Sequence, residues 1–389
     1  MASVKICRAT LFPYRLPLVR GLSTARGEVR GRRGWLLELQ ADSGEVGRGD
    51  ACPYPGDDEP ALPRDGFGME SWPACGERLE VLAAGLMGRG LSEAQAFLDS
   101  PEGSAPDAPA ARFALDCAVS ELAARSRACS VATWLAEAQG REPRARLAVS
   151  ALVSGGCEET IVGEAAALQR AGFQTFKLKL GGRPLDEDLA RVKALREALG
   201  PEAKLRLDAN AAFSPGDASA LLAALEGLDI ELVEQPVAAG DVEGLARVRA
   251  ESPVPIAADE ALVDRAAAER IIATRAADVL VLKPAALGGL RRAQALAAEA
   301  ARAGMAFYVT SLLDSAYGVA AATHLAAALP GSALAHGLAT AALFSFDLAR
   351  APLPNGGWLS LSTAPGWGLE ADSAATDRAR AGAAIEVGA

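Results

Sequence analysis

The chain has 389 residues with a formal net charge of −10 at pH 7, and half of its residues are hydrophobic. This acidic composition argues against a nucleic-acid surface, which needs clustered Lys and Arg, and no apolar run approaches the roughly 20 residues of a membrane-spanning helix. Six scattered Cys residues without a CxxC pair exclude the spacing of a typical zinc or disulfide site, so we expect a cytoplasmic protein with reduced thiols.

Residues 1–50 alternate between apolar and polar side chains in three runs. This pattern predicts an antiparallel three-stranded meander. Gly and Arg gather between the first two runs, at residues 20–33, and predict a mobile loop. Its arginines, Arg26 among them, have two interpretations: a solvated loop, or a lid over an anionic substrate.

Residues 76–98 and 110–138 have apolar residues at helical spacing, with turn-forming residues between them. We predict a helix in each range. The first strand of a second domain is predicted at 146–155, which places the domain boundary near residue 143.

Five short apolar runs alternate with amphipathic segments between Thr175 and Pro284. This alternation is typical of βα units that build a parallel sheet. Each run ends in charged residues, and in a barrel of such units these ends form the catalytic face. Two more strands are predicted at 305–311, which ends in Ser311, and at 332–338.

Three carboxylates end successive runs. Asp208, Glu234 and Asp259 follow one another at intervals of about 25 residues, roughly one βα unit per step. Acids that converge at the mouth of an apolar barrel repel one another unless a cation joins them, and hard oxygen donors suit Mg²⁺, for which Mn²⁺ can substitute. Asn210 is expected beside this site, whereas Glu260 is expected to point away from its centre.

Lysines flank the carboxylates on both sides. Lys177 and Lys179 lie two residues apart on one strand, so both should point into the barrel. Two neighbouring ammonium groups repel, which predicts that the pKa of one falls toward the range of a general base. With Lys283 on the other side of the metal, this set suits removal of a proton α to a carboxylate, with a metal-stabilised ene-diolate.

Residues near the last two strands have open interpretations. His336 either contacts substrate or is structural, and His324 is expected to be structural. Asp314 and Ser315 either cap the following helix or leave its N-terminal amides to hold a substrate carboxylate.

Five motifs at the strand ends resemble those of the muconate-lactonizing subgroup of the enolase superfamily: KLK at 177–179, DAN at 208–210, EQP at 234–236, ADE at 258–260 and LKP at 282–284. Within this subgroup, GRGDACPYPG at 47–56 and AHGLAT at 335–340 resemble the o-succinylbenzoate synthase family most. Ala339 stands where that family tends to have an acid. The resemblance covers nearly the whole chain.

The resemblance implies a (β/α)7β TIM barrel over residues 143–345. An N-terminal α+β capping domain, residues 1–142, would be completed by the C-terminal segment 346–389. It also implies that Lys179 is the base, that Lys177 tunes its pKa, and that Lys283 stabilises the ene-diolate as a cation. The other candidate site residues are the metal ligands Asp208, Glu234 and Asp259, their neighbours Asn210 and Glu260, and the substrate contacts Ser311 and Arg26.

The main functional prediction is an o-succinylbenzoate synthase. Such an enzyme dehydrates 2-succinyl-6-hydroxy-2,4-cyclohexadiene-1-carboxylate to o-succinylbenzoate on the route to menaquinone. The oligomeric state of the chain is left open.

The alternative is an N-acylamino-acid racemase or a dipeptide epimerase, which would use two lysines as acid and base on opposite faces of the substrate. A dipeptide epimerase typically has an Asp-x-Asp pair near the end of strand eight, and residues 335–344 contain no Asp. A muconate cycloisomerase is a weaker alternative. A non-catalytic binding barrel should have lost a ligand or a lysine, and all six are present.

Overall fold

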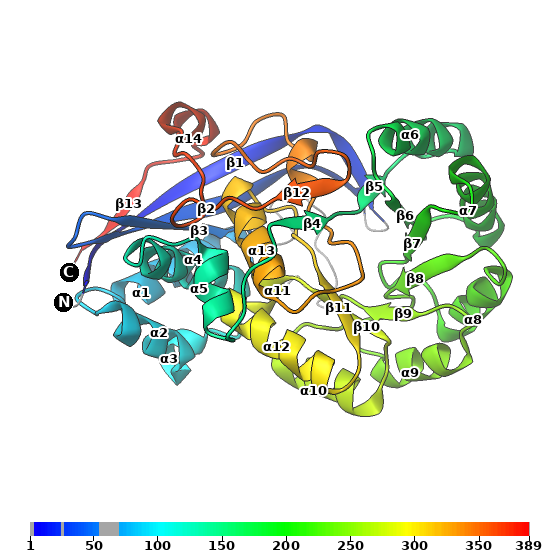
Figure 1. Ribbon diagram of the computed structural model, residues 1–389, viewed down its shortest axis with the longest axis horizontal. Coiled ribbons are helices and arrows are strands. Elements are labelled where there is room, and N and C mark those ends of the chain that lie inside the picture. The colour runs from blue at the N-terminus through cyan, green and yellow to red at the C-terminus, as the bar shows by residue number, and fades with distance from the viewer. Residues whose placement is uncertain (1–3, 25–26, 54–69, 389) are drawn as a thin grey trace.

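The computed structural model describes residues 4–24, 27–53 and 70–388. Its N-terminal strands form the predicted antiparallel meander, β1 (Ile6–Thr24), β2 (Gly27–Ala41) and β3 (Val46–Ala51). The C-terminal strand β13 (Ile385–Val387) pairs with the free edge of β1. The C-terminal tail therefore completes the capping layer, as predicted, and places Val387 opposite Ala9 of β1 (Figure 1).

The predicted loop at residues 20–33 is wrong for the described residues, because β1 continues to Thr24 and β2 begins at Gly27. Leu22 pairs with Val29 across this hairpin, and both side chains are buried. This cross-strand apolar pair extends the ladder through a segment whose Gly and Arg content resembles a loop. Arg26 lies outside the described residues.

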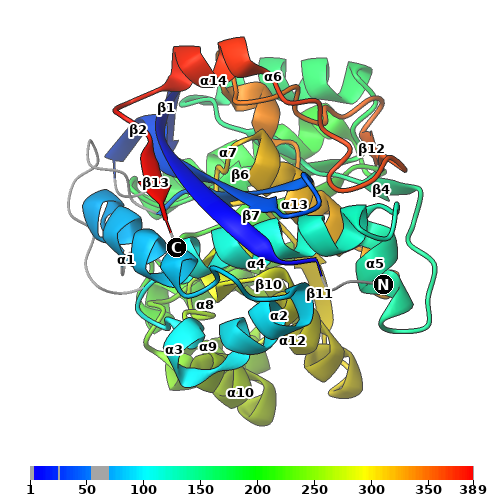
Figure 2. The ribbon, with the colours of Figure 1, turned by 90° about the vertical axis from the view of Figure 1, so that its left-hand side faces the viewer.

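Each of the two predicted helical ranges holds two helices, which lie in front of the barrel in Figure 2. The first range is broken near Gly88, which has a φ of +74°, and the second near Ala128, whose φ is +52°. Residues in the left-handed conformation commonly follow the end of a helix. Hydrophobic periodicity does not detect them, so each predicted range joined two separate helices. The helices of this region are α1 (Trp72–Ala84), α2 (Leu91–Asp99), α3 (Pro101–Ser104), α4 (Pro109–Arg125) and α5 (Val131–Glu137).

The second half of the chain forms the predicted parallel barrel. Seven strands stand side by side in chain order: β5 (Ala151–Val153), β6 (Thr175–Lys179), β7 (Lys204–Asp208), β8 (Ile230–Glu234), β9 (Ile256–Ala258), β10 (Val279–Leu282) and β11 (Ala306–Val309). The connecting helices lie outside them: α6 (Glu158–Arg170), α7 (Leu185–Leu199), α8 (Pro215–Ala224), α9 (Val242–Glu251), α10 (Arg265–Thr274), α11 (Pro284–Leu287), α12 (Leu290–Arg302) and α13 (Ala316–Ala328).

The predicted eighth strand is reduced to two bridging residues. His336 bridges to Val149 and Gly337 bridges to Thr310, so this short segment closes the ring between β5 and β11. The chain then forms the 3-10 turn η1 (Thr340–Leu343).

The predicted first strand, 146–155, is also divided. Its first part, β4 (Arg146–Ala148), leaves the barrel to pair with β12 (Trp358–Ser360), and a last helix, α14 (Ser373–Ala379), precedes β13. Within the described residues, no helix is both long and apolar enough to cross a membrane.

The capping layer is tied to the barrel through α4. The buried carboxylate of Asp116 accepts a hydrogen bond of 2.6 Å from the backbone N–H of Leu290, the first residue of α12. A carboxylate at a helix N-terminus is a favourable partner for its unsatisfied N–H groups. This contact helps to fix the capping layer over the barrel.

Candidate active site

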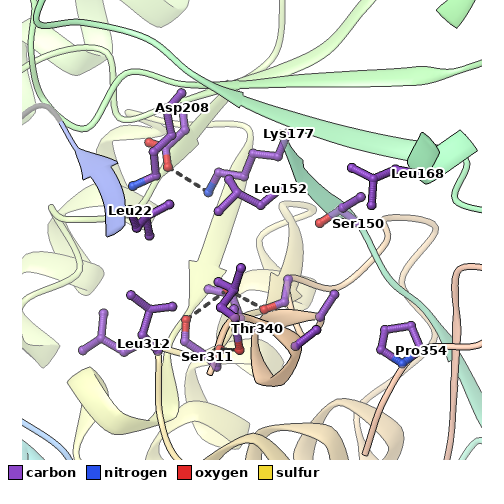
Figure 3. Close-up of a pocket in the computed structure, with 18 of the residues that line it drawn as sticks. Leu22, Ser150, Leu152, Leu168, Lys177, Asp208, Ser311, Leu312, Thr340 and Pro354 are labelled. Carbon is purple, nitrogen blue, oxygen red and sulfur yellow. Dashed lines mark hydrogen bonds and ion pairs between the residues drawn. The ribbon is translucent and has the colours of Figure 1, made fainter. Parts of the chain in front are cut away.

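A cavity of about 500 Å³ opens at the carboxyl ends of the barrel strands (Figure 3). The structure brings seven of the predicted site residues to its walls: Lys177, Lys179, Asp208, Asn210, Glu260, Lys283 and Ser311. Glu234 and Asp259 are buried next to it. Because parallel strands all point the same way, residues about 25 positions apart in the chain meet in one place.

Lysine ammonium groups lie between the carboxylates. Lys177 forms ion pairs with Asp208, at 2.9 Å, and with Glu234. Lys283 pairs with Asp259 at 2.7 Å. The buried acids of the ring are thus compensated by partly buried lysines, as buried charges require.

The three lysines have different pKa values. Burial lowers the pKa of Lys179, the repulsion of Lys177 adds to this, and Asp208 only partly offsets it. Burial alone would also lower the pKa of Lys177, but Asp208 and Glu234 outweigh it and raise that pKa. The pKa of Lys283 is raised in the same way by Asp259. This agrees with the prediction that one lysine of the neighbouring pair has a lowered pKa, which makes its amine more available as a base.

The three acids are also distinct. Burial raises the pKa of Asp259 to about 6 and raises that of Glu234. For Asp208, the charges of Lys177 and Lys179 overcome burial and lower the pKa to about 2. The acid with two lysine neighbours is therefore the one held most firmly as a carboxylate.

Oxygen atoms around this ring lack partners. Asn210 Nδ2 donates to Glu260 Oε1 at 3.1 Å, which places Glu260 on the cavity wall rather than pointing away as predicted. Asn210 Oδ1, Glu260 Oε2 and Asp259 Oδ1 are buried without hydrogen bonds. Unsatisfied buried oxygens are costly and indicate a missing water or ion.

The donor set fits a hard divalent cation, although its present geometry does not form a coordination shell. Among the described residues, no three His, Cys, Asp or Glu side chains stand together in a group that could hold a metal ion. Lys177, placed between Asp208 and Glu234, occupies the centre of the charges where a cation would compensate them. The oxygens without partners are the atoms that such an ion would satisfy.

The sequence analysis assigned no role to Tyr308, Arg206 or Gln235. The hydroxyl of Tyr308, on β11, donates to Glu234, and the guanidinium of Arg206 lies 4.7 Å from the Tyr308 ring centroid. Gln235 Oε1 accepts from the backbone N–H groups of Asp259, at 3.0 Å, and Ala261, at 3.1 Å. A polar residue at an inward position of a predicted strand was the available signal for Tyr308.

Ser311 reaches the cavity, as expected from its place after β11. Its hydroxyl lies 2.6 Å from that of Thr340, and Figure 3 shows this pair across the cavity from Lys177 and Asp208. On the hairpin of β1 and β2, Arg20 lines the cavity and binds Glu164 and Ser154 of the barrel. The capping layer thus contributes to the wall of the site.

The two histidines have structural contacts, whereas the capping role predicted for Asp314 and Ser315 is wrong. His336 is buried, accepts from the backbone N–H of Val309 at Nδ1, and does not line the cavity. His324 accepts from the N–H of Ala132. The side chains of Asp314 and Ser315 do not cap α13. Instead, Asp50 accepts from the N–H of Ser315, and Asp347 from that of Ala316.

Comparisons with known proteins show which proteins this chain resembles. A family model described as "Enolase C-terminal domain-like" matches residues 160–375. An L-Ala-D/L-Glu epimerase of Bacillus subtilis (strain 168) is 30% identical over 326 residues, which cover 83% of this chain and 85% of that enzyme. An o-succinylbenzoate synthase of Thermobifida fusca (strain YX) is 42% identical, but over 185 residues that cover 47% of this chain and 57% of that enzyme.

A crystal structure of a dipeptide epimerase from Enterococcus faecalis V583, complexed with Mg and the dipeptide L-Leu-L-Tyr, superimposes with a TM-score of 0.84. It is 25% identical and covers 95% of this chain and 99% of that chain. The matches include epimerases as well as a synthase. The family match and the barrel agree, and the chain belongs to the enolase superfamily.

Proposed function

We propose that this protein is a Mg²⁺-dependent racemase of N-acylated amino acids. The observation that carries the proposal is the position of two lysines on opposite sides of one cavity. Lys179 ends β6 and Lys283 follows β10, and these strands are four places apart in a ring of eight. Racemisation needs a base on one face of the α-carbon and an acid on the other.

The pKa values suit this division of labour. The lowered pKa of Lys179 makes its amine the more available base of the two. The raised pKa of Lys283 favours its protonated form, which can donate a proton to the opposite face. Each turnover leaves Lys179 protonated and Lys283 neutral, and in this state the two lysines act on the other enantiomer with their roles exchanged.

Asp208, Glu234 and Asp259 would hold the metal ion, supported by Asn210 and Glu260. When bound, Mg²⁺ supplies positive charge that stabilises the substrate carboxylate as the α-proton leaves. Lys177 would move from its place between Asp208 and Glu234 and remain protonated beside the carboxylate. Ser311 and Thr340 are in position to orient the rest of the substrate.

An acylated amine fits the cavity better than a free one. A dipeptide carries an ammonium group, which needs a carboxylate of its own. Among the described lining residues, the acids are Asp208 and Glu260 at the metal end and Glu164, which pairs with Arg20. Ala339, after the closing segment, supplies no charge. An N-acyl group needs none.

A second candidate is the o-succinylbenzoate synthase reaction. It is favoured by the 42% identity to the Thermobifida enzyme, although over less than half of this chain. Its dehydration needs one base, Lys179, and gives Lys283 the role of a cation that stabilises the ene-diolate.

The test is α-proton exchange in D2O, followed by ¹H NMR, with both enantiomers of an N-acyl amino acid and with polarimetry in parallel. The wild type should exchange and racemise both enantiomers, and EDTA should stop both processes. Lys179→Ala and Lys283→Ala should each abolish racemisation. Each variant should keep exchange for one enantiomer, and the retained enantiomers should be opposite.

The cyclohexadiene carboxylate is assayed beside it by ultraviolet absorbance. Fast dehydration without racemisation of any N-acyl amino acid would establish the synthase and overturn the racemase. Retention of full racemisation in Lys283→Ala would contradict the two-lysine mechanism itself.

A further inference from the structure

The cavity extends from the catalytic residues into an apolar side arm that the proposed proton transfer does not use. We define the side arm by the lining residues Leu152, Leu168, Phe173, Leu353 and Pro354. Figure 3 shows Leu168 and Pro354 at the end of the cavity away from Asp208, with Leu152 between them and the reacting groups. The arm is therefore continuous with the site.

One wall of the side arm is helix α6. Glu164 and Leu168 both line the cavity and are one helical turn apart, so they lie on one face of this helix. Phe173 follows the helix, and its backbone N–H donates to the carbonyl of Leu168 at 3.2 Å. The chain leaving α6 thus places a Leu and a Phe together.

A second wall is the segment 353–357, which is held in place from two sides. The N–H of Val149 donates to the carbonyl of Gly357 at 3.0 Å. A Cβ on Gly172 would lie 2.6 Å from the Cα of Gly356, and the φ of Gly172 is +94°. Only glycines permit this contact between backbones, so the chain is anchored at residues 356–357, next to the wall residues Leu353 and Pro354.

Leu353 shows that the arm is incompletely filled. Its side chain is 59% exposed although it lines a cavity, and few large hydrophobic side chains of the described chain are this exposed. An apolar group bound in the arm would remove this surface from water. Such burial is favourable in proportion to the apolar area covered.

The charges around the arm do not favour an anionic occupant. The described cations that line the cavity are the three lysines of the catalytic end and Arg20. Arg20 is already bonded to Glu164 and to Ser154. Arg20 and Glu164 compensate each other's charge, so this pair offers little net attraction to a second carboxylate, such as that of a succinyl group, placed beside Leu168.

Resting on the proposed function, we infer that the side arm binds the acyl group of the substrate and that this group is apolar and uncharged, such as a hexanoyl chain. The catalytic end then takes the amino-acid carboxylate and the α-carbon. Leu168, Phe173 and Leu353 determine the acyl specificity.

The experiment compares N-acetyl, N-hexanoyl and N-succinyl derivatives of the same amino acid by α-proton exchange in D2O. In the wild type, kcat/KM for the N-hexanoyl derivative should exceed that of the N-acetyl derivative roughly tenfold, since four added CH2 groups enter a partly apolar site. The N-succinyl value should lie below the N-hexanoyl value. Leu353→Asp and Leu168→Asp should each reduce the hexanoyl-to-acetyl ratio to about one.

Leu353→Asp changes an exposed side chain and should fold normally, so it decides the matter if Leu168→Asp does not fold. Val81→Asp is the matched control, because Val81 is 62% exposed on α1 and does not line the cavity. It should keep the tenfold ratio. Three results would overturn this inference and leave the proposed function intact. They are exchange with equal kcat/KM for all three derivatives, a preference for the N-succinyl derivative, and an unchanged hexanoyl-to-acetyl ratio in Leu353→Asp. Absence of exchange with every derivative would overturn the proposed function, and the inference with it.

Discussion

Two buried clusters of charged residues can be compared in this protein. The catalytic cluster is Lys177, Lys179, Asp208, Glu234, Asp259 and Lys283. The interface cluster is Tyr14, Arg32, Asp50 and Asp314, and it lies where the capping sheet meets the N-terminus of α13. Burial raises the pKa of Asp50 and, with repulsion from Asp50, raises that of Asp314 to about 7.

The clusters differ in what their charged atoms contact. In the interface cluster, Asp50 accepts from the Tyr14 hydroxyl and from the N–H of Ser315, and Arg32 donates to backbone carbonyls. In the catalytic cluster, the lysines line a cavity. Both clusters contain groups with shifted pKa values, so a shifted pKa does not by itself mark a catalytic group. The catalytic cluster differs from the interface cluster in its access to a cavity.

The largest expected effect is loss of activity on removing the base. Lys179→Ala should reduce kcat for racemisation by about 10³-fold or more, because general-base catalysis typically contributes 10²–10⁴-fold. The neighbouring Lys177 does not replace it, because Asp208 and Glu234 raise its pKa. The midpoint of thermal unfolding should change little. Lys193→Ala, at an exposed position on α7, is the matched control and should retain wild-type kcat. Wild-type activity in Lys179→Ala would show that this cluster is not catalytic.

The second effect concerns the compensation of charge. Lys177→Met should destabilise the metal-free protein by about 3 kcal/mol or more, because it leaves the buried Asp208 and Glu234 without their cation. Added Mg²⁺ should restore much of this stability, since the ion replaces the lost charge. Chemical denaturation with EDTA and with Mg²⁺ measures both.

The control for this variant is Lys204→Met. Lys204 also pairs with a glutamate, Glu231, at 3.1 Å, but its side chain is 54% exposed. Exposed ion pairs contribute about 1 kcal/mol or less, so this variant should differ little from wild type and should not respond specially to Mg²⁺. Equal losses of stability in the two variants would show that charge compensation by Lys177 contributes no more to stability than an exposed ion pair does.

A smaller effect is expected at Tyr308, which links the acids to the barrel interior. Tyr308→Phe removes the hydroxyl that donates to Glu234 and keeps the ring beside Arg206. Loss of a hydrogen bond to a metal-ligating residue typically lowers metal affinity about 10-fold or more. Calorimetric titration with Mg²⁺ checks this, and an unchanged affinity would mean that Glu234 needs no such support.

The elements that repeat could be predicted from the sequence, and those that depend on single contacts could not. The barrel strands and the carboxylate ring follow a period of about one βα unit, so the spacing alone placed Asp208, Glu234 and Asp259 together. Tyr308 belongs to no motif, and its role depends on a partner, Glu234, from another strand. The helix breaks near Gly88 and Ala128 depend on local backbone conformation, which hydrophobic periodicity does not report.

The side arm lay beyond sequence analysis for a related reason. It is formed where Gly172 meets Gly356, two residues separated by most of the barrel, and glycines leave no periodic signal. The position of Lys177 between the acids was also not predictable, because spacing gives the level of a side chain on its strand but not its partner.

The smallest expected effect tests the interface cluster through pH. The folded pKa of Asp314 is about 7, against an ordinary value of 3.8. A carboxyl group whose pKa is raised on folding stabilises the protein below its unfolded pKa, and that stability is lost as the pH rises through the folded pKa. The side-chain amide in Asp314→Asn cannot ionise, so the variant should lack this loss. The unfolding midpoint of the wild type, measured relative to that of Asp314→Asn, should therefore fall between about pH 4 and pH 8, by a few degrees.

This prediction also separates the clusters functionally. Asp314→Asn should keep its kcat across the same pH range, because Asp314 contacts the backbone N–H of Leu312 and does not line the cavity. A constant difference in midpoint between wild type and variant would show that Asp314 does not titrate in this range. A change in kcat that follows the change in midpoint would show that the two clusters act as one, because Leu312 and Leu313 join the interface cluster to the cavity wall.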